Sequence, residues 1–160
     1  MAYGSTARVV YNNLSLLGAA ELGMIFTNRN SLNYKYFKET TNVPTYILSS
    51  RDYISTVEYE SAILDLLTMH SIDVIFLNYD RLLGQTLLNA YPLSIYNVHL
   101  SLLPFFRGTE SISKSFANDM LFYGSTINAI DEQVDRGHII AQACLAREHG
   151  EGIESFTHKL

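Results

Sequence analysis

Apolar positions along this chain follow two different periods, and each period predicts one kind of element. The segment 72–77 (Ile-Asp-Val-Ile-Phe-Leu) is nearly continuously apolar, which is typical of a parallel strand covered on both faces. In 57–70 the apolar residues instead recur on one face of a helix. The same patterns predict strands at 21–27, 45–48, 72–77, 95–99, 125–130 and 139–146, and helices at 7–17, 32–40, 57–70, 82–89, 109–120 and 153–160.

The order of these elements predicts an α/β fold. Alternating strands and helices are typical of three layers around an open, mostly parallel sheet of Rossmann type. The length of 160 residues suits one domain, so we expect a single domain spanning 1–160. A small-residue turn, Gly4-Ser5-Thr6, stands directly before the first predicted helix. In an α/β unit a strand usually precedes such a turn. There is no room for that strand, so we expect the first strand to be missing.

Composition and charge narrow the classes of function. The net charge is −5 and no block of Lys or Arg occurs, which disfavours nucleic-acid binding. No apolar run approaches membrane-spanning length, no secretory signal is visible, and the single Cys144 fits a reducing compartment. We therefore expect a cytoplasmic protein without a membrane partner. No metal site is predicted, because ligand spacing is absent among His70, His138, His149 and His158.

Candidate chemistry lies where predicted strands end. Asn97 and His99 are two residues apart, so on an extended strand their side chains point to the same face. An amide and an imidazole side by side can polarise a carbonyl and move a proton. The polar loop 131–137 (Asp-Glu-Gln-Val-Asp-Arg-Gly) follows another strand, and a carboxylate on it could hold the charged imidazole. Because no Ser or Cys stands in a nucleophile context, direct transfer between two bound substrates is favoured over a covalent intermediate.

Three segments resemble the folate-dependent formyltransferase family. Segment 97–104 (Asn-Val-His-Leu-Ser-Leu-Leu-Pro) is similar to that family's Asn-x-His-Pro-Ser-Leu-Leu-Pro, with Leu100 in place of a proline. Segment 131–142 resembles the family's Asp loop, and 25–29 (Ile-Phe-Thr-Asn-Arg) resembles the second-strand Ser-Asn-Arg of its glycinamide ribonucleotide formyltransferases. The resemblance covers most of the chain. It implies a Rossmann-like formyltransferase fold that stops here before the family's C-terminal helices.

The resemblance also implies a mechanism and its residues. Asn97 and protonated His99 would donate hydrogen bonds to the formyl oxygen of 10-formyltetrahydrofolate, the expected co-substrate, as a substrate amine attacks. Asp135 would stabilise the charged imidazole, and no metal is implied. The pterin is expected at Asn97 and at main-chain groups around Arg81, Leu82, Leu83, Asp131 and Val134. The amine substrate is expected near Ser101 and Gly108, with its phosphate at Gly4, Ser5 and Thr6.

Three hypotheses about function stay open. The first is formyl transfer to glycinamide ribonucleotide in purine synthesis, by a monomer or a homodimer. The second is another reaction of the same family: a methionyl-tRNA or sugar-nucleotide formyltransferase, towards which Phe106-Arg107-Gly108 leans, or a formyltetrahydrofolate hydrolase. The third is a non-catalytic folate- or nucleotide-binding protein, suggested by Leu100, by Asp80 and by the two shortened ends. Formation of a formylated amine separates the first hypothesis from the third.

Overall fold

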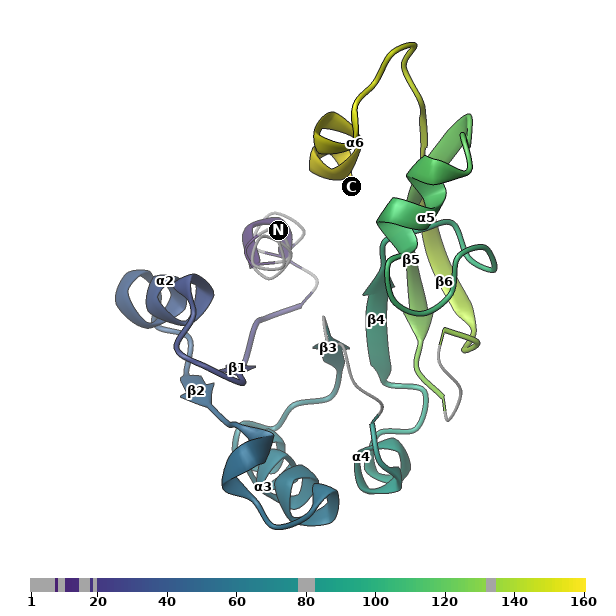
Figure 1. Cartoon of the computed structure of the whole chain (residues 1–160). Helices are drawn as coiled ribbons and strands as arrows, with labels where there is room; N and C mark the ends of the chain where they lie inside the picture. The colour runs from purple at the N-terminus through teal and green to yellow at the C-terminus, as the bar shows by residue number, and fades with distance from the viewer. Residues whose placement is uncertain (1–7, 9–10, 15–17, 19, 78–82, 132–134) are drawn as a thin grey trace. The chain divides into compact units, whose positions relative to one another are not determined.

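The chain is an α/β protein in the computed structural model, which describes residues 8, 11–14, 18, 20–77, 83–131 and 135–160. It divides into two compact units: Met1–Asp73 with Gly84–Ala90, and Val74–Leu83 with Tyr91–Leu160. Figure 1 labels the elements of both units. The strands are β1 (Ile25–Thr27), β2 (Thr45–Ile47), β3 (Ile75–Leu77), β4 (Ile95–His99), β5 (Phe122–Ala129) and β6 (Ile139–Ala146). The helices are α2 (Leu32–Thr40), α3 (Thr56–Met69), α4 (Gln85–Ala90), α5 (Ser111–Ala117) and α6 (Ile153–Lys159), with a short 3₁₀ turn at Ser50–Asp52.

The first unit combines two short parallel strands, β1 and β2, with the helices α2, α3 and α4. Serine hydroxyls begin two of these helices. Ser31 accepts from the N–H of Tyr34 in α2 at 3.2 Å, and Ser55 accepts from the N–H of Glu58 in α3 at 3.1 Å. Each cap satisfies a first-turn N–H that has no partner within the helix. The buried apolar side chains of this unit include Phe37, Ile63, Leu67 and Leu87.

The second unit contains a four-stranded sheet in the order β3-β4-β5-β6. β3 and β4 are parallel, whereas β4 pairs with β5 and β5 pairs with β6 in antiparallel register. This sheet is therefore mixed, and not mostly parallel as the alternation of elements predicted. For β5 and β6 the physical reason is the short connection between them: only residues 130–138 join the two strands, whereas parallel neighbours need a crossover of about a dozen residues or more.

One face of the four-stranded sheet carries an apolar cluster. Tyr123 of β5 stacks on Phe156 of α6 with ring centroids 3.8 Å apart, and Phe116 of α5 meets Phe156 edge-on at 5.5 Å. The Tyr123 hydroxyl donates to Glu151 at 3.3 Å, and Lys159 pairs with the same carboxylate at 2.8 Å. Burial, and then the Glu151 charge, raises the pKa of Tyr123, while the hydrogen bond from Lys159 lowers the pKa of Glu151. An aromatic stack and an ion pair therefore hold α6 on the sheet.

Most predicted elements are confirmed, with limits that differ by a few residues. β4, β6 and α2 have the predicted limits, whereas β1 and β3 are shorter than the predicted 21–27 and 72–77. β1 is short because its ladder with β2 extends only from Ile25 to Thr27. Of the helix predicted at 7–17, residues 8 and 11–14 are helical, and the others lie outside the described residues. None of the described helices combines the length and the hydropathy that crossing a bilayer requires.

Candidate active site

Strand β4 brings two predicted catalytic side chains to one face of the sheet. Asn97 and His99 are separated by one residue on β4 and so point to the same side. Across the β4–β5 pair, Asn97 lies opposite Asn128 and His99 lies opposite Thr126. Directly opposite residues of an antiparallel pair share a face. Asn97, His99, Thr126 and Asn128 therefore form one surface, which we call the polar face.

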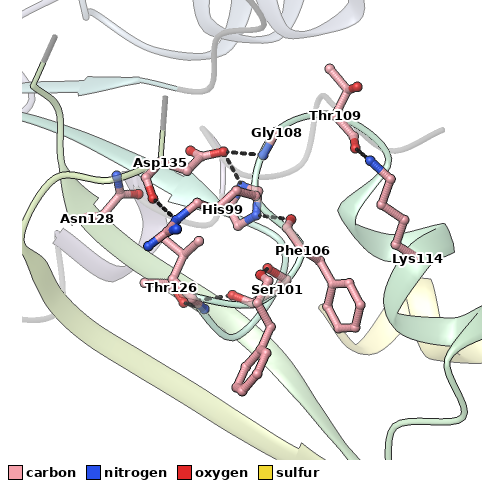
Figure 2. A network of polar contacts seen from close by, with 12 residues as sticks. His99, Ser101, Phe106, Gly108, Thr109, Lys114, Thr126, Asn128 and Asp135 are labelled. Carbon is pink, nitrogen blue, oxygen red and sulfur yellow. Dashed lines mark hydrogen bonds and ion pairs between the residues drawn. The ribbon is translucent and has the colours of Figure 1, made fainter. Parts of the chain in front are cut away.

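His99 is paired with Asp135, the second acid of the loop 131–137. Its Nδ1 lies 3.3 Å from Oδ2 of Asp135, and the two side chains are only 7% and 10% exposed (Figure 2). The other ring nitrogen, Nε2, lies 2.9 Å from the backbone oxygen of Phe106. Both nitrogens thus face acceptors, and a histidine can donate to two acceptors only when both nitrogens carry a proton. The arrangement therefore suits a positively charged His99 held by Asp135.

The carboxylate of Asp135 is in turn held by the residues that follow His99. Oδ2 of Asp135 accepts the N–H of Gly108 at 2.7 Å, and its backbone oxygen accepts from Nε of Arg107 at 3.0 Å. Asp135 and Phe106, which supply the two acceptors for His99, have positive φ values of 49° and 54°. Residues other than glycine occupy this left-handed region at a cost, and such positions cluster at functional sites. The backbone thus sets both partners of the imidazole.

A buried hydroxyl connects the turn after β4 to the sheet. Thr126 is fully buried, donates to the backbone oxygen of Ser101 at 2.7 Å and accepts from the N–H of Leu103 at 3.0 Å. Gln142 of β6 donates to the same hydroxyl at 3.0 Å and to the Leu103 carbonyl at 2.8 Å. Ser101 donates to the carbonyl of Phe105 at 2.7 Å. Because these bonds satisfy buried polar groups of the turn, the sheet determines the path of the turn.

Asn128 is the most deeply buried amide of the polar face. It is 2% exposed, and its Nδ2 donates to the carbonyl oxygen of Ala129 at 3.3 Å. Its Oδ1 is also buried and has no hydrogen-bond partner in the described part of the chain. Exchanging the two amide atoms would place Oδ1 against the Ala129 oxygen, so the position of Nδ2 follows from that contact. An unpaired acceptor therefore lies beside Asn97.

Chemically, the polar face offers hydrogen-bond donors and not a nucleophile. N–H groups of Asn97 and His99 can stabilise the negative charge that develops on a carbonyl oxygen under attack. The carboxylate of Asp135 lies where it would stabilise an imidazolium. Within the described ranges, no three His, Cys, Asp or Glu side chains form a group that could hold a metal ion. Such a site suits attack on a carbonyl carbon by a second substrate.

The structure brings together part of the predicted site. Asp135 is bonded to His99 and to Gly108, whereas Ser101 is 1% exposed and lies inside the turn. Leu83 is half-buried and Asp131 is exposed, and their contacts with the pterin stay predictions. The other expected binding residues, Gly4, Ser5, Thr6, Arg81, Leu82 and Val134, lie outside the described residues.

Sequence reasoning missed three polar side chains of this site: Thr126, Asn128 and Gln142. Thr126 and Asn128 alternate with an apolar residue, which is the same two-residue period that singled out Asn97 and His99. That signal was present in the sequence. Only the pairing of β5 with β4 and β6 makes these residues neighbours, with Gln142 opposite Thr126.

Comparison with known proteins bears on this geometry. A family model described as "Formyl transferase" matches residues 3–160. The phosphoribosylglycinamide formyltransferase of Bacillus subtilis is 37% identical over 126 residues, which are 76% of this chain and 65% of that enzyme. The alignment thus spans slightly less than two thirds of that relative's length.

Two solved structures are similar over nearly the whole chain. Phosphoribosylglycinamide formyltransferase from Bacillus halodurans has a TM-score of 0.85 at 29% identity, covering 98% of this chain and 82% of that one. Glycinamide ribonucleotide transformylase 1 from Geobacillus kaustophilus has a TM-score of 0.87 at 33% identity, covering 97% and 84%. The predicted Rossmann-like formyltransferase fold is therefore confirmed. Because the family model also matches residues 3–160, the chain belongs to the formyl transferase family.

Proposed function

We propose that this chain transfers the formyl group of 10-formyltetrahydrofolate to the amine of 5'-phosphoribosylglycinamide, a step of de novo purine biosynthesis, in the cytoplasm. The whole span 1–160 serves as its catalytic domain. The observation that carries the proposal is the buried pair of His99 and Asp135 beside Asn97. Relatives of similar fold and sequence are named for this reaction, which supports the choice of substrate.

Asn97 and His99 act on the oxygen of the formyl group. As the amine nitrogen attacks the formyl carbon, that oxygen takes up negative charge, and N–H donors placed at it lower the barrier. Nδ1 of His99 stays with Asp135, so Nε2 is the nitrogen that turns from the Phe106 carbonyl to the formyl oxygen. The amide of Asn97 supplies the second donor. Removing one donor of this kind typically costs about 10²–10³ in kcat.

Asp135 holds the imidazolium while bonds and protons are exchanged. A new bond forms between the amine nitrogen and the formyl carbon, and the bond from that carbon to the folate nitrogen breaks. The proton lost by the amine passes through water to the leaving nitrogen. The amine attacks the formyl carbon directly, without an acyl-enzyme. The hydroxyl on the polar face, that of Thr126, is engaged in three hydrogen bonds and does not serve as a nucleophile.

The turn at Arg107 and Gly108 bears on the alternative reactions. In the sequence alone, the Arg107-Gly108 pair favours the tRNA-dependent enzymes of the family. Here the Arg107 Nε and the Gly108 N–H both bond to Asp135, so the two residues have a task within the site that involves no RNA. Formyl transfer to a small amine accounts for them without a further partner.

Product analysis tests the proposal. The purified full chain is incubated with 10-formyltetrahydrofolate, with and without 5'-phosphoribosylglycinamide, and the products are identified by mass spectrometry. We expect the formylated amine and tetrahydrofolate only when the amine is present. Formate released without the amine would indicate the hydrolase. In a separate incubation with methionyl-tRNA in place of that amine, formylation of the tRNA alone would indicate the tRNA-dependent reaction. Binding of both substrates without any product would refute catalysis.

A further inference from the structure

The sheet of the second unit keeps one buried acceptor without a donor. Asn128 is 2% exposed, and no described residue donates to its Oδ1. Folded proteins rarely bury such an atom unpaired, because it has lost water and gained nothing in return. Its Nδ2 is fixed by the Ala129 carbonyl at 3.3 Å, so Oδ1 faces away from that carbonyl. Figure 2 shows Asn128 with Thr126 and His99 on this side of the sheet.

Asn97 is the neighbour that can supply the missing donor. It lies directly opposite Asn128 in the β4–β5 register, where the Cβ atoms of facing residues are about 4.5–5.5 Å apart. Two amide side chains can meet across that distance. Oδ1 of Asn128 is buried, so we look for its donor among the adjacent side chains. The side chain of Asn97 is half-buried.

We propose that Asn128 is a positioning residue that acts through Asn97. In the complex with both substrates, Oδ1 of Asn128 accepts one N–H of the Asn97 amide. The second N–H of that amide then points at the formyl oxygen, since an amide nitrogen carries two protons in one plane. The inference rests on the proposed function, because it assigns Asn97 its donor task. It gives the buried Oδ1 of Asn128 a hydrogen-bond partner.

A double-mutant cycle tests this relation. Asn128→Leu is made in the wild-type chain and in the Asn97→Ala variant, and kcat and KM for the amine are measured for all four proteins. Leucine has a similar volume and removes the unpaired oxygen, so the single variant should unfold at the same or a higher urea concentration. Its kcat should nevertheless fall by about 10- to 100-fold with an unchanged KM for the amine, because an aimed donor acts in the transition state.

The effect of Asn128→Leu on kcat in the Asn97→Ala variant decides between a positioning role and a structural role of Asn128. In Asn97→Ala the leucine substitution should cause no further loss of kcat, because the group that Asn128 aims is already gone. Ser115→Ala, at a buried serine of α5, is the matched control and should leave kcat unchanged. If the leucine variant fails to fold, Asn128→Ala enters the same cycle with the same expectation.

Two results would overturn the inference in different ways. An active wild type in which Asn128→Leu loses nothing, or loses equally in both backgrounds, overturns the positioning role alone. A wild type that transfers no formyl group overturns the proposed function and the positioning role with it. The two failures are therefore distinguishable from the wild-type rate.

Discussion

Thr126 lies directly opposite His99 in the β4–β5 register, and its hydroxyl ties the turn that follows His99 to the sheet. The position of His99 therefore depends on both the strand β4 and the turn that follows it. β4 sets the position of its backbone, and the turn presents the Phe106 carbonyl to Nε2 at 2.9 Å. Because the Thr126 hydroxyl supports the turn, stability and catalysis should both depend on it.

Replacing Thr126 by valine should destabilise the fold. The shape is kept, but the N–H of Leu103 and the amide of Gln142 lose an acceptor, and the Ser101 carbonyl loses a donor. Buried groups left unpaired cost about 1–3 kcal/mol each, so we expect the free energy of unfolding in urea to fall by about 3 kcal/mol. Thr40→Val on the exposed side of α2 is the control, with a change within about 0.5 kcal/mol. Equal stability of the two variants would show that the bonds of Thr126 contribute nothing.

Replacing Gly137 by alanine should displace the loop that carries Asp135. A Cβ atom at Gly137 would lie 1.7 Å from the backbone oxygen of Ala129, so the loop or β5 has to move. We expect kcat to fall at least about tenfold and the free energy of unfolding to fall by about 1–3 kcal/mol. Gly152→Ala is the matched control, because its φ is −81° and nothing lies within 4 Å of the added carbon. A Gly137→Ala variant with normal turnover would contradict this packing.

Glu151 should make α6 sensitive to acid. Its pKa lies below the usual 4.5 because Lys159 donates to the carboxylate, so the unfolded chain binds more protons at low pH. The stabilisation is present above the usual pKa and is lost as the pH falls through the lowered one. Glu151→Gln should therefore lower the melting temperature at neutral pH, and the difference from wild type should shrink below a pH of about 4. Glu154→Gln, at an exposed position of the same helix, should show no such trend in thermal unfolding.

Local patterns were enough to locate most elements. β6 has the predicted limits because its apolar residues end at the polar segment 147–149, and α2 is bounded by the Ser31 cap. The direction of strand pairing was harder to predict. The antiparallel pairing of β4 with β5 depends on contacts between residues distant in sequence, which no local period encodes, whereas the short connection between β5 and β6 is visible in the sequence.

The sequence also predicted only some of the residues of the candidate site. Asn97 and His99 follow from a two-residue period on one strand, and Asp135 came from the resemblance to a family motif. The partner of Nε2 is a backbone carbonyl, that of Phe106, and backbone groups leave no trace in residue identity. Asn128 carried a visible period, but its importance depends on burial, which only the folded sheet determines.

The proposed function requires Asp135 and His99 to act as a pair on the formyl group. Its most direct test is kcat/KM for formyl transfer in wild type, Asp135→Asn and Asp119→Asn. Asparagine at 135 keeps an acceptor for the Gly108 N–H but removes the charge beside Nδ1 of His99. Asp119 is 93% exposed, so its variant makes the same chemical change outside the site.

We predict that Asp135→Asn lowers kcat/KM by about 10²–10⁴ while its unfolding in urea stays near that of wild type. Asp119→Asn should keep wild-type kcat/KM. An Asp135→Asn variant that transfers the formyl group as fast as Asp119→Asn would contradict the account.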